Sequence, residues 1–191
     1  MIECQDVSFS YPASTLPDSE RQAGGALKHI SSTIEDGSFV LLCGTSGCGK
    51  TTMTRLFNGL IPHYHEGTYT GSVYLDGKDT RDLSLFDISL KVGSVFQNPR
   101  SQFFNVDTTS ELAFGPENHG IAEDLVRDRV KRVAAQLKLE PLLDRSIFSL
   151  SGGEKQKIAC GSAAAIDPDV YVLDEPSSNL DAYAIADFRQ L

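Results

Sequence analysis

Apolar residues along the 191-residue chain follow two patterns in its first quarter. Apolar and polar residues alternate over Ile2 to Phe9 and again over Leu27 to Ile34, and this period of two predicts two strands. Residues 12–26 between them are rich in Pro, Ser, Gly and charge, which predicts an exposed loop. Glu35-Asp36-Gly37 predicts a hairpin turn into the continuous apolar run Phe39 to Cys43, which reads as a buried strand. We therefore expect an antiparallel layer at the start of the chain.

The rest of the chain mixes short apolar runs with helical spacing. Ala122 to Leu139 is the clearest helix, because its apolar residues recur three or four positions apart, at Leu125, Val126, Val130, Val133, Ala134 and Leu137. Asp107 to Glu111 contains capping residues and predicts another helix start. Further strands are expected over 71–79, 92–96 and 170–173, and further helices over 52–60, 83–91, 151–165 and from 181 onward.

The turn between the apolar run at 39–43 and the helix at 52–60 carries the most informative motif. Its sequence, Gly44-Thr45-Ser46-Gly47-Cys48-Gly49-Lys50-Thr51, fits the pattern of a phosphate-binding loop between a strand and a helix. Glycines let the backbone approach a phosphate, and the N–H groups at the helix start attract an anion. Lys50 would add positive charge at the β- and γ-phosphates, and Thr51 a hydroxyl for Mg²⁺.

Charge and composition argue against several classes of function. The composition is that of an ordinary globular protein, and the formal net charge of −9 argues against a general nucleic-acid or anionic-membrane surface. No run of apolar residues is long enough to span a membrane. The four cysteines have no metal-binding spacing, which suggests a reducing compartment.

Two further stretches suit phosphate chemistry. Asp174 ends the apolar run Val170 to Leu173, at the sheet edge where ligands bind, and could hold Mg²⁺. Glu175 comes next and could polarise a water for attack on a γ-phosphate. Ser151-Gly152-Gly153 begins a helix and could contact a second phosphate, although an ordinary N-cap with a capping-box acid would have the same residues. Two such helix starts suggest that two domains share each nucleotide.

These motifs, in this order, resemble those of ABC-type ATPases. Leu150 to Gln156 (LSGGEKQ) is similar to the signature motif, residues 44–51 to Walker A, and Val170 to Pro176 to Walker B with its catalytic Glu. Residues 178–181 resemble the D-loop, Gln97 takes the Q-loop position, and Tyr11 the place of the adenine-stacking aromatic. The segments 58–67, 96–105 and 111–118 are similar to the ATPases of energy-coupling factor (ECF) and cobalt-type importers, including the first half of their tandem members.

The resemblance implies a role for each matching residue. Glu175 would act as general base, with Gln97 and Lys50 as its catalytic partners, and Thr51, Gln97 and Asp174 would serve Mg²⁺ and the attacking water. The ATP-binding residues would be Tyr11, Gly44, Thr45, Ser46, Gly47, Cys48, Gly49, Lys50, Thr51, Thr52, Ser151, Gly152, Gly153 and Asp181. Of these, Ser151 to Gly153 would contact the γ-phosphate of a nucleotide held by the partner domain, and Asp181 would act across that interface.

The same resemblance implies an architecture. We expect an α/β P-loop NTPase core, a mostly parallel sheet flanked by helices, with an N-terminal antiparallel β layer and an inserted helical subdomain. Residues 1–97 would form the β layer and the phosphate-loop part of the core. Residues 98–165 would form the helical subdomain with the signature motif, and residues 166–191 the Walker B part. The family's switch His and later core strands would lie beyond Leu191, so we expect a fragment that binds ATP but hydrolyses it poorly.

The function implied is the ATP-hydrolysing subunit of a membrane importer of a vitamin or metal ion. Its partners would be a second ATPase domain and a transmembrane subunit that contacts residues 97–102, and no nucleic acid. It would be cytoplasmic and peripheral on the inner face of the membrane. The alternatives are a soluble ABC ATPase that acts on nucleic acid or ribosomes, and a nucleotide-binding half that does not hydrolyse ATP.

Overall fold

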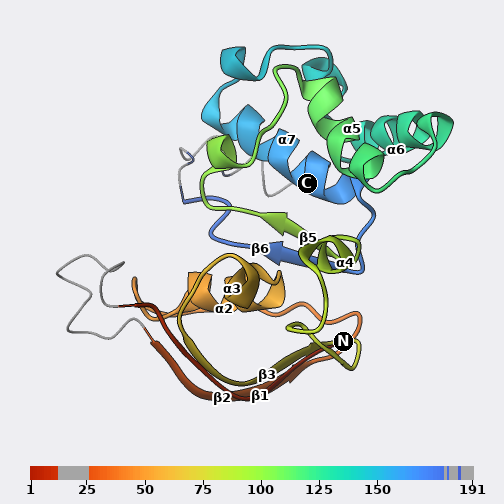
Figure 1. Ribbon diagram of the computed structural model, residues 1–191. Helices are drawn as coiled ribbons and strands as arrows, with labels where there is room; N and C mark the ends of the chain where they lie inside the picture. The colour runs from red at the N-terminus through yellow and green to blue at the C-terminus, as the bar shows by residue number, and fades with distance from the viewer. Residues whose placement is uncertain (13–25, 179, 181–184, 186–191) are drawn as a thin grey trace. The chain divides into compact units, whose positions relative to one another are not determined.

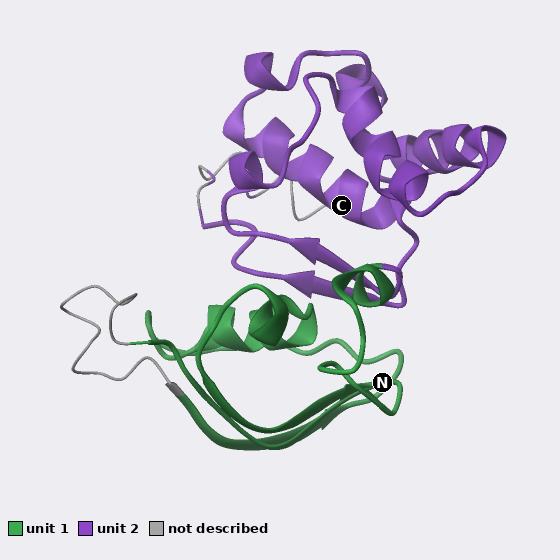
Figure 2. Cartoon of the chain, viewed as in Figure 1, with its two compact units in different colours: residues 1–89 green, residues 90–191 purple. Residues whose placement is uncertain are grey.

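The computed structural model describes residues 1–12, 26–178, 180 and 185 (Figure 1). The chain forms two compact units, residues 1–89 and 90–191 (Figure 2). Most of the predicted loop at 12–26 and of the predicted helix from Asp181 lies outside the described residues. The division into segments 1–97, 98–165 and 166–191 stays a prediction.

An antiparallel sheet organises residues 1–89, as the alternation of apolar residues predicted. Its strands are β1 (Ile2–Ser10), β2 (Ala26–Ile34), β3 (Thr68–Leu75) and β4 (Lys78–Asp79), in the order β2-β1-β3-β4. The buried residues of β1 lie two apart except between Cys4 and Val7, where the register shifts against both neighbouring strands. The extra residue forms a β-bulge, in which Asp6 has a φ of 49°. Beyond the bulge, the buried residues Val7 and Phe9 therefore lie on the same face of the sheet as Ile2 and Cys4.

Short helices bury the apolar face of this sheet. They are α2 (Lys50–Phe57) and α3 (Leu60–His63), which Figure 1 shows over one side of the strands. The short helix α4 (Leu85–Ser89) lies near Gly59 at the end of α2, through Leu85 and Ile88. Leu56 and Ile61 from the helices are fully buried, as are Phe9 and Val73 from the sheet. This packing holds the start of α2, and with it the end of the phosphate loop.

The strand predicted over Phe39 to Cys43 is wrong for this structure. The run has no regular secondary structure, and its side chains are exposed, with Phe39 at 91% and Leu41 at 73%. An apolar run becomes a strand only where a neighbouring strand supplies partners for its N–H and C=O groups. In the described part of residues 1–89 the four strands pair among themselves, and none pairs with this run.

Residues 90–191 combine a pair of parallel strands with a helical layer. The strands β5 (Val92–Val95) and β6 (Val170–Leu173) pair in register from Val92↔Val170 to Val95↔Leu173. Each strand was predicted, but of the four residues in β6 only Val172 is buried, because the side chains of Tyr171 and Leu173 point to an exposed face. The helices are α5 (Thr108–Asn118), α6 (Glu123–Gln136) and α7 (Gly152–Ala165), with 3₁₀ turns at η2 (Pro99–Ser101), η3 (Glu140–Leu142) and η4 (Ile147–Ser149).

The helical layer has one apolar core that all three helices share. The α6 prediction is confirmed at four of its apolar positions, which are buried against α5 and α7: Val126, Val130, Val133 and Ala134. Leu125 was predicted for the same face but is exposed, because it precedes Val126 and points about 100° away from it around the helix. At Gly161 of α7 the helices approach so closely that an added Cβ would lie 2.6 Å from Leu139.

Candidate functional site

The phosphate-loop motif forms an exposed turn that continues into the first two residues of α2, Lys50 and Thr51. Gly47 and Gly49 have φ values of 78° and 102°, in the left-handed region that glycine adopts at little cost. Gly49 is the N-cap of α2, and a Cβ there would lie 2.8 Å from Leu27. The first turn of α2 contains no acidic residue, so its N–H groups present an uncompensated positive end to an anion.

The Lys50 ammonium lies against this loop. Lys50 Nζ donates to the carbonyl oxygens of Gly44 (3.3 Å) and Thr45 (3.2 Å). The Thr45 oxygen also accepts from the Cys48 N–H (3.3 Å), which closes the turn around Ser46. Carbonyl contacts of this length can be exchanged for phosphate oxygens, because a phosphate offers the same donor a charged acceptor.

The two threonines after Lys50 differ in exposure. Thr51 is partly exposed, and its carbonyl accepts from the Thr54 hydroxyl (2.9 Å) within α2. Thr52 is buried in the first turn of α2. The loop itself, Gly44 to Cys48, is exposed, so its backbone can be reached from solvent.

Tyr11 is held by residues from the end of β1 and from α2. Its hydroxyl accepts from Arg55 Nη1 (2.8 Å), and the Arg55 guanidinium carbon lies 5.9 Å from the ring centroid. Phe9 and His65 make edge-to-face contacts with the ring, at centroid distances of 4.9 and 6.1 Å. Burial, followed by the Arg55 charge, lowers the pKa of His65, which favours a neutral imidazole beside the ring.

In residues 90–191 the parallel strands bring Gln97 and Glu175 together. Gln97 Nε2 donates to Glu175 Oε2 (3.3 Å) just beyond the carboxyl ends of β5 and β6. Asp174 is only 8% exposed, and its N–H donates to the Val95 carbonyl (2.9 Å), which extends the parallel ladder by one bond. Glu175 follows with a φ of 45°, an uncommon value outside glycine, and this turns its side chain out of the strand direction.

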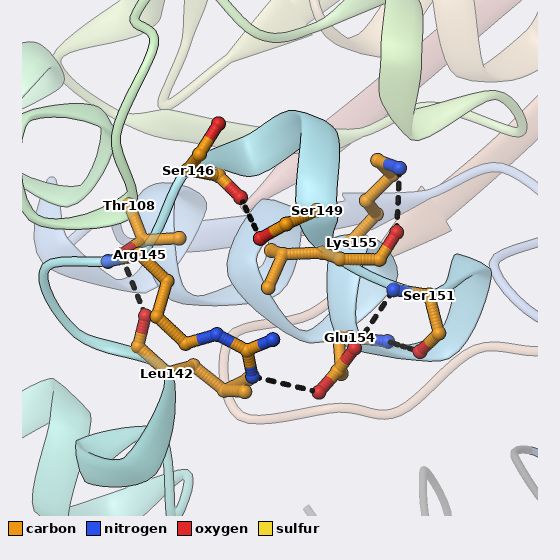
Figure 3. A network of polar contacts seen from close by, with 9 residues as sticks. Thr108, Leu142, Arg145, Ser146, Ser149, Ser151, Glu154 and Lys155 are labelled. Atoms are coloured by element: carbon orange, nitrogen blue, oxygen red, sulfur yellow. Dashed lines mark hydrogen bonds and ion pairs between the residues drawn. The ribbon is translucent and has the colours of Figure 1, made fainter.

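Ser151 begins α7 as an N-cap with a complete capping box. Its hydroxyl oxygen accepts from the Glu154 N–H (3.3 Å), and its own N–H donates to Glu154 Oε2 (2.7 Å) (Figure 3). The hydrogen bond from the Ser151 N–H, rather than the charge of the nearby Arg145, is the main cause of the lowered pKa of Glu154. Gly152 and Gly153 occupy the first turn, where the N–H groups have no partner within an α-helix.

Comparison with known proteins decides the family. The family model for the ABC transporter matches residues 27–178, which is most of the chain. The chain belongs to the ABC transporter ATP-binding family. A relative from Treponema denticola, an ABC transporter ATP-binding protein by its assigned name, is 48% identical over all 191 residues. A Pyrococcus horikoshii protein of the same description is 45% identical over 184 residues, 95% of this chain and 61% of its own length.

The chain spans about a third of the length of the first relatives that it matches, 37% for two proteins from Treponema denticola. Among solved structures, cbiO1 from Clostridium perfringens is 27% identical, with a TM-score of 0.77 over 97% of this chain and 69% of that one. That protein is described as part of the ABC transporter complex cbiONQ, which confirms the predicted resemblance to ECF-type ATPases. The ATP-binding cassette MJ0796 shares the fold, with a TM-score of 0.78 over this whole chain and 80% of that one at 24% identity.

The expected ABC ATPase fold is therefore confirmed in outline, with its antiparallel β layer and helical subdomain. The Walker A residues and Tyr11 belong to residues 1–89, whereas Gln97, the Walker B carboxylates and the signature residues belong to residues 90–191. Asp181 lies outside the described residues. Within the described part of the chain, no helix is both long and apolar enough to cross a membrane.

The supporting roles of three residues were not predicted from the sequence. Gln102 accepts from the Phe96 N–H (3.1 Å) and donates to the Ser94 carbonyl (3.1 Å), so its amide pairs with the end of β5 just before Gln97. Glu111 is buried and accepts from two backbone N–H groups in the segment after Gln102. Arg145 pairs with Glu154 at 3.2 Å. Glu111 was part of a predicted helix start, but its burial could not be predicted from its own position, and Gln102 and Arg145 lie in irregular segments without a periodic pattern.

Proposed function

We propose that this chain is the ATP-binding part of an ABC-type importer that hydrolyses ATP to drive uptake of a small nutrient, a vitamin or a metal ion. The observation that carries the hydrolytic part is the contact between Gln97 and Glu175 beside the buried Asp174. It puts an amide and two carboxylates at the carboxyl ends of parallel strands, where α/β proteins bind ligands. Family membership supplies the rest of the argument.

ATP would bind first through its phosphates. The N–H groups of residues 44–51 and the start of α2 would surround them, and Lys50 would exchange its contacts with the Gly44 and Thr45 carbonyls for phosphate oxygens. Thr52 would support the same loop from its buried position. The ring of Tyr11, whose orientation Arg55 and Phe9 restrain, would stack on the adenine.

The chemistry of three side chains suits Mg²⁺. Thr51, Gln97 and Asp174 offer a hydroxyl, an amide oxygen and a carboxylate, and oxygen donors are the ones that this hard cation prefers. When bound, Mg²⁺ would offset negative charge on the β- and γ-phosphates. Asp174 is suited to the role because its backbone is fixed by the hydrogen bond to Val95.

Glu175 would act as the general base. Its carboxylate would accept a proton from the water that attacks the γ-phosphorus, while the Gln97 amide holds one of its oxygens. The turn at Glu175, with its positive φ, separates the direction of this carboxylate from that of Asp174. Two adjacent acids can in this way have different tasks.

The signature residues would serve a nucleotide bound by another ATPase domain. The N–H groups of Gly152 and Gly153 and the Ser151 hydroxyl would contact its γ-phosphate, with Asp181 acting across the same interface. That domain would be a second copy, a related subunit or another part of one longer chain. The length of the relatives, of which this chain covers 37% in the first two, supports the last arrangement.

A membrane partner is proposed from the likeness to cbiO1, which is part of a transporter complex. The segment from Gln97 to Gln102 would contact the transmembrane subunit, and the protein would then be peripheral on the inner face of the membrane. Association with purified membranes, compared with ribosomes and DNA, tests this assignment. Enrichment on ribosomes or DNA would contradict it.

The hydrolytic role has a separate test. In the full-length protein, Glu175→Gln should retain MgATP binding and lose nearly all phosphate release, because the amide cannot accept the proton of the attacking water. Glu117→Gln, an exposed position on α5, is the matched control and should release phosphate at the wild-type rate. Undiminished phosphate release by Glu175→Gln would remove Glu175 from the mechanism.

A further inference from the structure

The capping acid of the signature helix poses an electrostatic problem. A carboxylate at the third position stabilises a helix start, and Glu154 does so through its bond to the Ser151 N–H (2.7 Å). The same negative charge lies in the first turn of α7, which also contains the N–H groups proposed to receive a γ-phosphate. Without compensation, Glu154 would therefore repel the ligand that this helix start is proposed to bind.

Arg145 lies where it can provide that compensation. Its Nη1 donates to Glu154 Oε1 (3.2 Å), while the other carboxylate oxygen caps Ser151 (Figure 3). Both carboxylate oxygens are thus used, one by the helix cap and one by a guanidinium. The second cation nearby, Lys155, is buried and donates to the Leu150 carbonyl (2.6 Å), so it fixes the backbone of the signature rather than the acid.

The backbone of Arg145 is anchored to a different helix. Thr108, fully buried at the start of α5, donates its N–H to the Arg145 carbonyl (3.0 Å) and accepts from the Arg145 N–H at its hydroxyl oxygen (3.2 Å). The Thr108 hydroxyl in turn donates to the Leu142 carbonyl (2.6 Å). The neighbouring Asp144 is bound to Thr109 instead, through its carboxylate (2.7 Å) and its N–H (2.9 Å). The backbone of Arg145 is therefore held by a residue outside the signature motif, Thr108.

We infer that Arg145 is a positioning residue of the signature motif, which neutralises Glu154 so that the start of α7 can cap itself with an acid and still accept a phosphate from the partner domain. This inference rests on the proposed function. The pair is partly exposed, at 41% and 32% of the two side chains, so its effect should be moderate and sensitive to salt.

The test is a double-mutant cycle on ATP hydrolysis by the full-length protein. Arg145→Ala should raise the KM for ATP about three- to fivefold at low salt, the size expected of one charge near a helix terminus. In the Glu154→Gln background, which removes the acid's charge, the same substitution should change KM by less than about 1.5-fold. Arg145→Lys should stay within about twofold of wild type because it keeps the charge.

Two further variants keep the result interpretable. Arg127→Ala removes an arginine from an exposed ion pair with Glu123 on α6 and should leave KM unchanged. If Arg145→Ala fails to fold, Arg145→Gln carries the same test, because it retains a hydrogen-bond donor without the charge.

An equal rise of KM in both backgrounds would overturn the inference, since Arg145 would then be only a structural support. No change of KM in either background would overturn it as well. Absence of phosphate release by the wild type is a different result, because it refutes the proposed function and this inference with it.

Discussion

The buried acid Glu111 provides a prediction whose size can be worked from its contacts. Its Oε2 accepts from the Phe104 N–H (3.0 Å), the Asn105 N–H (2.8 Å) and Asn105 Nδ2 (3.3 Å), and the residue is 2% exposed. These bonds fix Phe104 and Asn105, just after the segment Gln97 to Gln102 that is proposed to contact the membrane subunit. We predict that Glu111→Gln loosens these two residues without unfolding the protein.

The size of this loosening follows from the loss of the negative charge of Glu111. A hydrogen bond to a charged acceptor contributes about 1.5–3 kcal/mol and a neutral one about 1 kcal/mol. The amide oxygen can still accept the two backbone bonds, and the cost of burying a charge is removed, so a net loss of about 2 kcal/mol is expected. That loss corresponds to about thirtyfold more frequent local opening.

Hydrogen exchange of the backbone amides of Phe104 and Asn105 measures this opening. Exchange at both amides should become about thirtyfold faster in Glu111→Gln, while amides in β1 remain as protected as in the wild type. Glu117→Gln on the exposed face of the same helix is the control and should change neither group. Wild-type exchange rates at Phe104 and Asn105 in Glu111→Gln would refute the reasoning, as would a uniform rise throughout the chain.

Three other predictions follow from single positions. Bound MgATP should protect Cys48 from a maleimide, because this exposed thiol lies in the phosphate loop. Cys160 should react slowly with or without nucleotide, because burial raises the pKa of its thiol to about 12. Mass spectrometry of the labelled peptides measures both reactions. Gly161→Ala should lower the free energy of unfolding by about 1–3 kcal/mol in urea titrations, because its Cβ would meet two buried leucines, and an unchanged midpoint would contradict the packing. The N-cap bond from the Ser110 N–H lowers the pKa of Asp107. The stabilisation of α5 by Asp107 is therefore complete above the unfolded-state pKa and is lost as pH falls through the folded-state pKa. The Tm difference between wild type and Asp107→Ala should shrink between about pH 6 and about pH 3.

Local signals in the sequence account for most of the elements. The alternation in β1 and β2 and the capping box of α7 depend on neighbours in the chain, and each formed where it was predicted. The run Phe39 to Cys43 has an equally strong apolar pattern but lacks strand structure. A strand needs a partner from elsewhere in the chain, and hydropathy contains no information about that partner.

The same distinction applies to the candidate site. Motif spacing predicted the glycine turn of the phosphate loop and the order of Asp174 and Glu175 at a strand end. The contact of Gln97 with Glu175 follows once β5 and β6 are parallel neighbours. Arg145 could not be predicted, because its role depends on Thr108 and Glu154, which reach it through the fold rather than through a spacing along the chain.

One experiment tests both the phosphate site and hydrolysis: titration of the full-length protein with MgATP, wild type beside Lys50→Ala, with bound nucleotide and released phosphate followed together. The wild type should bind MgATP and release phosphate, and Lys50→Ala should lose both, because the loop then lacks its cation for the β- and γ-phosphates. Equal binding by the two proteins would contradict the assignment of residues 44–51 as the phosphate site. Binding by the wild type without phosphate release would contradict the proposed roles of Gln97 and Glu175.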